Sequence, residues 1–102
     1  MTSSGPTQAA IVLLPDAERD LRRLRSHAAR FLTRLQTLAT RPERGHPLRG
    51  PLAGARSLVL SQQGGGYRAV YIYDVLKNEC RVLAIGEHAT VYETAVQRFS
   101  TR

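Results

Sequence analysis

The chain has 102 residues, a single cysteine and a net charge of +7 at pH 7. A chain this short fills one hydrophobic core, so we expect a single domain over residues 9–102 behind a flexible tail at residues 1–8. The longest apolar run, residues 9–14, is far shorter than the roughly 20 residues of a membrane span, and no signal-peptide pattern precedes it. Cys80 has no partner for an intrachain disulfide. These features predict a cytoplasmic protein without a membrane partner.

The positive charge is concentrated in the middle of the chain. Residues 19–56 contain ten arginines and two acidic residues, Asp20 and Glu43, whereas the remainder is close to neutral. A basic excess confined to one segment favours a polyanion or an acidic protein as partner. For any one of these arginines the alternative is an ordinary solvated helix surface. The prediction of a partner therefore rests on the segment as a whole.

The first part of the chain predicts a strand followed by two helices. Residues 10–14 are aliphatic and β-branched, as is typical of a strand, and Pro15 closes the run. Asp16 is a good N-cap for a helix that begins at about Ala17. Ser26 can cap a second helix, so one long helix and a helical hairpin broken near Arg25 are both open. We favour the hairpin, because two shorter helices cover a small sheet better. The apolar stripe consists of residues spaced three and four apart: Ala17, Leu21, Leu24, Ala28, Phe31, Leu35 and Leu38.

The second half of the chain predicts a loop, three strands and a helix. Pro42 ends the helical region, because the residue before a proline is driven out of the α conformation. A loop rich in proline and glycine follows up to Arg56. The expected elements after it are strands at residues 57–61, 67–73 and 81–85, a glycine turn at 62–66, and a helix at 91–99. The order βααβββα predicts an α+β fold, a sheet with helices packed on it.

Three residues near the last two strands are candidates for a site that binds an anion. Arg68 lies inside an apolar strand, and a guanidinium forms paired hydrogen bonds to phosphate oxygens. His88 follows the next strand, and its ordinary pKa near neutrality suits a general acid or base. Tyr92 has a ring that can stack on an unpaired base or orient a phosphate. Cleavage of RNA through its 2′-hydroxyl needs a base and positive charge at the phosphate, so this set predicts such chemistry.

Each candidate also has a purely structural alternative. Arg68 can pair with Asp74 or Glu87 in a surface network, which is common for exposed charges. His88 can be a solvated turn residue, and Tyr92 can anchor the last helix by packing. The single cysteine and three scattered histidines show no metal-ligand spacing, so we expect neither a metal nor a cofactor.

Four segments, in this order, carry a family resemblance. They are residues 14–17 (LPDA), 48–58 (LRGPLAGARSL), 66–71 (GYRAVY) and 85–93 (IGEHATVYE). Over residues 12–99 the chain resembles the RelE/ParE superfamily of bacterial toxins from type II toxin–antitoxin systems. The resemblance implies a small, mostly antiparallel sheet with the N-terminal helical hairpin packed on one face and a short C-terminal helix. It also implies a concave active face on the other side of the sheet.

The resemblance implies a function as well. RelE-like members cut mRNA in the ribosomal A site, ParE-like members poison DNA gyrase, and a cognate, usually acidic antitoxin neutralises both. We expect a ribosome-dependent mRNA endoribonuclease that inhibits translation, with the ribosome, mRNA and an acidic antitoxin as partners. Operator DNA is expected only indirectly, through the antitoxin complex. The alternatives are a gyrase inhibitor and a catalytically degenerate member that only binds antitoxin or operator DNA.

The resemblance also assigns site residues, with one departure from the family pattern. Arg68 and Tyr92 match catalytic positions, and His88 falls where many members have an arginine. RelE-like nucleases often carry lysines on the second strand, where this chain has none. The mechanism implied here therefore depends on His88. The residues that could supply phosphate-binding charge in place of those lysines are Arg49, Arg56 and Arg81.

Overall fold

The computed structural model describes residues 7–63 and 66–100. Most of the predicted tail at residues 1–8 and part of the predicted turn at 62–66 lie outside these residues, so the division into tail and domain stays a prediction. The strands are β1 (Ala10–Leu13), β2 (His46–Pro47), β3 (Arg56–Ser61), β4 (Tyr67–Asp74) and β5 (Glu79–Glu87). The helices are α1 (Pro15–Arg23), α2 (Ala28–Gln36) and α3 (His88–Ser100), with short 3-10 turns η1 (Arg25–His27), η2 (Thr37–Ala39) and η3 (Gly50–Leu52).

The strands form one five-stranded sheet in the order β1-β5-β4-β3-β2. β1 pairs with β5 in parallel, and the other neighbours are antiparallel. The predicted α+β class and the mostly antiparallel sheet are therefore confirmed. β2 was missed, because two residues inside a loop rich in proline carry no periodicity.

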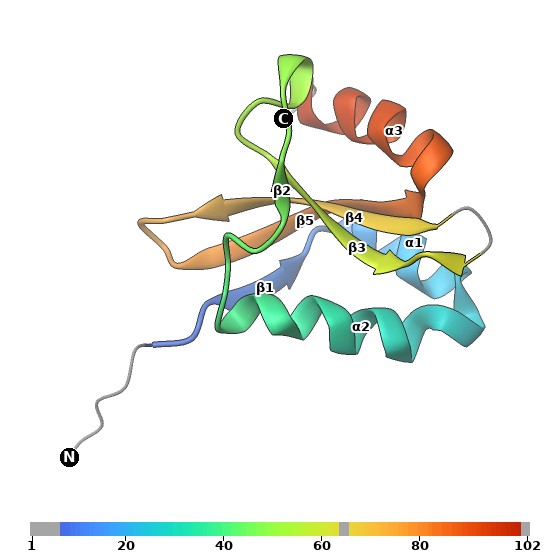
Figure 1. The fold of residues 1–102 in the computed structure, drawn as a ribbon, viewed down its shortest axis with the longest axis horizontal. Helices are drawn as coiled ribbons and strands as arrows, with labels where there is room; N and C mark the ends of the chain where they lie inside the picture. The colour runs from blue at the N-terminus through green and yellow to red at the C-terminus, as the bar shows by residue number, and fades with distance from the viewer. Residues whose placement is uncertain (1–6, 64–65, 101–102) are drawn as a thin grey trace.

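Helices cover both faces of the sheet (Figure 1). α1 and α2 pack on one face, where Leu21 and Phe31 meet Tyr71 and Val82 in a buried cluster. α3 and η3 pack on the opposite face, where Val91 and Ala95 lie in a second cluster. α3 starts three residues earlier than predicted and covers part of the face that the resemblance left open. No helix among the described residues is both long enough and apolar enough to cross a membrane.

The predicted hairpin is confirmed, although its caps differ from those expected. The break falls at Arg25, which has a left-handed φ of 36°. Leu14 is the N-cap of α1, because Pro15 already has the fixed φ of a first helical residue. Asp16 therefore lies inside the first turn, where it pairs with Arg19. Ser26 lies in η1 and does not cap α2.

A buried tyrosine holds the start of the loop that follows the helices. The Tyr71 hydroxyl donates to the Pro42 carbonyl oxygen at 2.8 Å and accepts from the Gly45 N–H at 2.9 Å. Arg56 donates to the carbonyl oxygens of Glu43 and Gly45. Burial raises the pKa of the Tyr71 phenol, so this side chain stays neutral and keeps its donor. The loop thus begins at a fixed position before it runs past α3.

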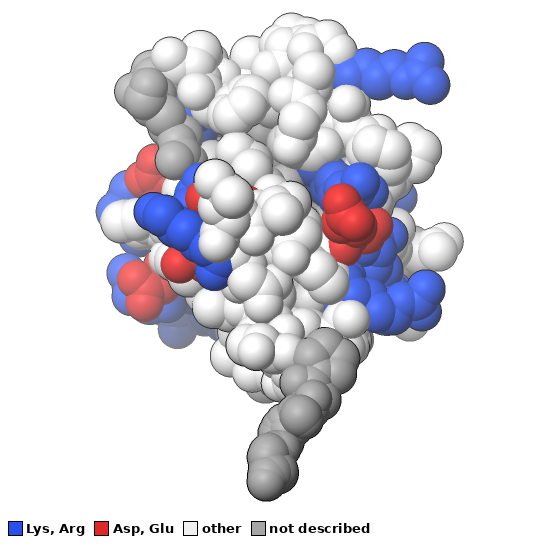
Figure 2. Space-filling model, turned by 90° about the vertical axis from the view of Figure 1, so that its left-hand side faces the viewer, with Lys and Arg blue, Asp and Glu red and all other residues white. Residues whose placement is uncertain are grey.

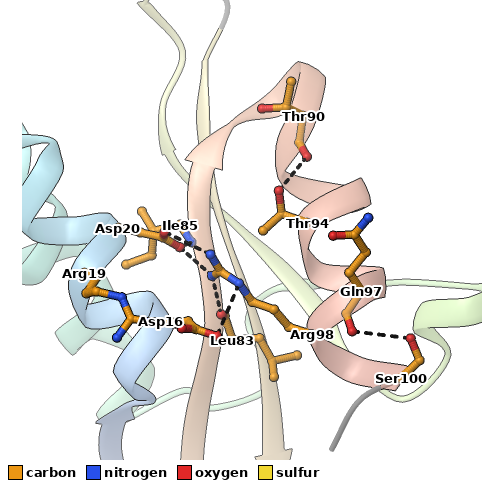
Figure 3. Close-up of polar contacts among 10 residues, drawn as sticks. All are labelled: Asp16, Arg19, Asp20, Leu83, Ile85, Thr90, Thr94, Gln97, Arg98 and Ser100. Atoms are coloured by element: carbon orange, nitrogen blue, oxygen red, sulfur yellow. Dashed lines mark hydrogen bonds and ion pairs between the residues drawn. The ribbon is translucent and has the colours of Figure 1, made fainter.

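An ion pair completes the edge of β5 beyond the end of β1 (Figure 3). β1 pairs with β5 only as far as Val82. Farther along, the Ile85 N–H donates to the Asp20 carboxylate at 3.0 Å, and Arg98 donates to the Leu83 carbonyl oxygen at 2.9 Å. Arg98 also makes two hydrogen bonds to Asp20, of 2.7 and 3.1 Å, and these raise the pKa of the guanidinium. The pair therefore joins α1 to α3 across the sheet edge.

Asp20→Asn tests this ion pair. The amide removes the charge of the carboxylate that lies nearer to the partly buried Arg98, so we expect a loss of about 2–4 kcal/mol in the free energy of unfolding. Asp16→Asn is the matched control on the same helix, because Asp16 lies 3.7 Å from Arg98 and is about half exposed (46%). It should cost less than about 1 kcal/mol. Equal losses in urea denaturation would contradict the assigned role of Asp20.

Cys80 offers a second test of the core. The Cys80 side chain is fully buried, which raises the pKa of its thiol to about 11. The folded chain should resist iodoacetamide at pH 8, whereas the chain in urea, with a thiol pKa near the ordinary value of about 8.5, should react. Because the folded state keeps the proton longer, this burial should stabilise the protein at neutral pH, and the contribution should fade between about pH 8.5 and 11. Rapid labelling of the folded chain, read by mass spectrometry, would contradict this packing.

Candidate functional site

Arg68 lies on the face of the sheet that α3 covers. It sits in β4 opposite Val59 of β3 and Gly86 of β5, and its side chain is half-buried. Its Nη1 donates to the neighbouring Tyr67 carbonyl oxygen at 3.3 Å. Arg68 makes no ion pair with any described carboxylate, and Asp74 pairs with Arg81 instead. Among the described residues, no carboxylate therefore neutralises this guanidinium.

Gly66 makes room for this arginine. It has a φ of +87°, a conformation that favours glycine. A Cβ at this position would lie 2.8 Å from Nη1 of Arg68 and 3.2 Å from the Ser61 carbonyl oxygen. The glycine was part of the segment that carried the resemblance, but its role in making space for Arg68 becomes visible only in the structure.

His88 opens α3 at the same end of the sheet. Its main-chain N–H donates to the Gly66 carbonyl oxygen at 3.0 Å, two residues before Arg68. The imidazole is exposed and meets the Tyr92 ring edge-on, with 5.4 Å between ring centroids. The first turn of a helix presents free N–H groups and a partial positive charge, both of which favour an anion. His88 is therefore the first residue of α3, with its imidazole against the Tyr92 ring, and not a residue of a solvated turn.

Tyr92 reaches from α3 across the sheet to β3. Its hydroxyl shares a hydrogen bond of 2.9 Å with the hydroxyl of Ser57, a buried polar residue. The half-buried ring also packs against the cluster under α3. Tyr92 therefore packs against the core, as its structural alternative proposed, and its ring also borders an open groove. Ser57 was not predicted as a site residue, since a serine in a strand gives no signal of its partner.

A groove of about 350 Å³ lies between α3 and the loop before β3. Arg49 stands on its wall with Tyr92, so the structure brings these two predicted residues together. The remaining wall is apolar and consists of Leu48, Pro51, Leu52 and Val96. The groove can accept a flat or apolar group beside a positive charge.

The structure does not bring Arg56 or Arg81 to this surface. Arg56 pairs opposite Tyr71 in the register, so it points to the face covered by α1 and α2 and binds the loop there. Arg81 makes ion pairs with Asp74 and Glu79 at 3.0 and 3.2 Å, which raise its pKa. It lies five residues before Gly86 along β5, roughly 17 Å away at about 3.4 Å per residue. Both guanidinium groups have structural partners.

The assembled surface places positive charge beside an imidazole and an aromatic ring. Arg68 and the first turn of α3 supply positive charge, and His88 supplies a titratable group beside them. Tyr92 and Arg49 line the adjoining groove. Among the residues that the structure describes, no group of three histidine, cysteine or acidic side chains could hold a metal ion.

Comparison with known proteins identifies the family. Residues 11–92 match the family model of the ParE toxin of the type II toxin–antitoxin system parDE. The chain belongs to this toxin family. The resemblance to the RelE/ParE superfamily that its four segments predicted is thus confirmed. No curated protein sequence matches the toxin.

Two solved structures share the fold of this toxin. The toxin–antitoxin complex RelBE2 from Mycobacterium tuberculosis is 26% identical, with a TM-score of 0.62 over 85% of this chain and 99% of that chain. A double arginine-to-alanine mutant of the E. coli toxin RelE in the free state is 24% identical, with a TM-score of 0.70 over 89% and 97% of the two chains. The toxin thus shares its fold with the RelE structures, although its sequence matches the ParE family model.

Two glycine substitutions separate backbone strain from displacement of Arg68. Gly66→Ala and Gly54→Ala both place a side chain at positive φ, but a Cβ at Gly54 would meet no atom within 4 Å. We expect both to lower the free energy of unfolding by about 1–2 kcal/mol. Only Gly66→Ala should also weaken growth inhibition on induction, because its Cβ requires the Arg68 guanidinium to shift. Full growth inhibition by a folded Gly66→Ala toxin would contradict the assigned position of Arg68.

Proposed function

We propose that this toxin is a ribosome-dependent mRNA endoribonuclease that inhibits translation. The observation that carries the proposal is Arg68, which is half-buried and makes no ion pair with a described carboxylate, beside the start of α3 where His88 lies. A guanidinium left unpaired next to a helix N-terminus suits a phosphate.

The proposed reaction is attack of an RNA 2′-oxygen on the adjacent phosphorus. Neutral His88 takes the proton from the 2′-hydroxyl, and the 2′-oxygen bonds to phosphorus. Arg68 and the α3 N–H groups stabilise the added negative charge on the phosphate oxygens. The bond to the 5′-oxygen then breaks, and that oxygen takes a proton from water. The products are a 2′,3′-cyclic phosphate and a 5′-hydroxyl end.

Tyr92 and Arg49 are proposed to hold the RNA beside the reacting phosphate. The Ser57 hydrogen bond fixes the Tyr92 ring at the groove, where a base can stack on it. Arg49 on the same wall can bind the next phosphate. The ribosome would supply the orientation of the mRNA, because this open surface encloses no substrate.

A cognate antitoxin is the proposed regulator. The toxin carries a net charge of +7, which favours an acidic partner. RelBE2, which shares the fold at 26% identity, is a toxin–antitoxin complex. Operator DNA would be bound only indirectly, through the antitoxin, and a ribosomal target would place the activity in the cytoplasm.

Inhibition of DNA gyrase is the second candidate function. The matching family model describes the ParE toxin. On β3, Ser57 and Val59 face the site, and no lysine stands there as a second cation. A gyrase inhibitor needs no group that transfers protons, so its toxicity would not depend on His88. The third alternative, a degenerate member, predicts no growth inhibition.

Induced expression in cells tests these functions with single variants. We expect wild-type toxin to stop growth and protein synthesis and to produce mRNA cuts at the ribosomal A site by primer extension. His88→Gln should lower cleavage by about 10²–10⁴-fold, the usual contribution of a general acid or base. His46→Gln is the matched control, since His46 is an exposed histidine of β2. Circular dichroism confirms that each variant folds.

The other outcomes separate the alternatives. Growth arrest with intact mRNA, together with gyrase-dependent DNA breaks that persist in His88→Gln, would establish the second candidate and overturn the ribonuclease. Normal growth with well-expressed wild-type toxin would establish the degenerate member.

A further inference from the structure

A second basic surface lies on the other face of the sheet from Arg68. At the C-terminal end of α1, a shallow hollow of about 420 Å³ is lined, among the residues that the structure describes, by Arg19, Arg22, Arg23 and Arg25. We call it the arginine hollow. α1 packs in the core cluster on the face opposite α3, so the hollow is separate from the candidate active site.

The charge of the hollow is only partly neutralised. Arg19 pairs with Asp16, and Arg22 lies 3.9 Å from Glu18 with both side chains more than half exposed. Arg23 and Arg25 are exposed and make no ion pair with any residue that the structure describes. Asp20 is the acidic residue closest in sequence to Arg23 and Arg25, but its carboxylate binds Arg98 and the Ile85 N–H instead. Two guanidinium groups therefore remain available for an external anion.

Other surfaces of the molecule have a different character. On the side shown in Figure 2, acidic side chains lie against several of the basic ones, and other basic side chains stand apart among uncharged residues. The groove beside Tyr92 has one arginine and an apolar wall. An acidic peptide gains much of its affinity from apolar anchors, and none of the described residues that line the arginine hollow is apolar. A regular row of phosphates needs only charge and hydrogen-bond donors.

The hollow also lies near the end of the sheet that carries the active site. The Leu14 N–H, before α1, binds the Val82 carbonyl oxygen, and Asp20 binds the Ile85 N–H. α1 thus runs alongside β5 toward the end at which α3 begins (Figure 1). Its C-terminal arginines therefore lie toward the end where His88 stands, on the opposite face.

We propose that the arginine hollow binds the phosphodiester backbone of a nucleic acid, at a site separate from Arg68. Guanidinium groups suit this ligand because they stay charged and bind phosphate oxygens in pairs. The binding is independent of base sequence and of cleavage, so it does not rest on the ribonuclease activity.

The test measures binding of fluorescent 12-mers by anisotropy, without ribosomes. The probes are 2′-O-methyl RNA, which cannot be cut through its 2′-hydroxyl, and DNA of the same sequence. The variant is Arg23→Gln/Arg25→Gln. The matched control is Arg41→Gln/Arg44→Gln, which removes the same charge from two exposed arginines in the loop between η2 and β2. Thermal unfolding verifies that both variants fold.

The hollow variant should bind RNA roughly tenfold more weakly at about 0.1 M salt, and the control less than threefold. The plot of log affinity against log salt should become shallower by about 1.4, since each of the two lost phosphate contacts with a single strand contributes roughly 0.7 to the steepness. Similar affinities for RNA and DNA support recognition of the backbone that both share. A higher affinity for one of them identifies that nucleic acid as the ligand of the hollow. Equal losses in variant and control would overturn the proposal. So would poly-glutamate that binds the hollow more tightly than either oligonucleotide.

Discussion

The position of α3 depends on the ion pair between Asp20 and Arg98. β1 is too short to pair with the second half of β5, which leaves backbone groups at Leu83 and Ile85 without a strand partner. The carboxylate accepts from one of these groups and the guanidinium donates to the other, while the two side chains bind each other. One interaction therefore completes the sheet edge and fixes α1 and α3 on opposite faces.

The candidate active site follows from that arrangement. With α3 docked by Arg98 near its C-terminus, its first turn lies beside the start of β4, where Arg68 and Gly66 stand. Tyr92 then reaches β3 and hydrogen-bonds Ser57. The site is thus built from three consecutive strands and the helix that follows them. Its geometry depends on the fold more than on any local motif.

Much of the fold could be predicted from the sequence, because periodicity and prolines determine it. The apolar stripe predicted the helical region and Pro42 its end, the need to cover a small sheet favoured the hairpin, and the element order with the family resemblance predicted the sheet. Arg68, His88 and Tyr92 were also predicted from their residue types and places. The roles of Arg56 and Arg81 could not be predicted, because the strand register and the carboxylates beside them decide which arginine stays unpaired. The Ser57 partner of Tyr92 is likewise a contact between residues 35 apart in the chain.

We infer that Arg68, His88 and Tyr92 form one phosphate-binding surface. NMR titration of the ¹⁵N-labelled toxin with a 2′-O-methyl dinucleotide tests it most directly, since so short a ligand reports a single site. We expect saturable shifts at Gly66, Arg68, His88 and Tyr92, because these residues surround the proposed phosphate position. Shifts confined to other surfaces, or no shift at these residues at millimolar ligand, would contradict it.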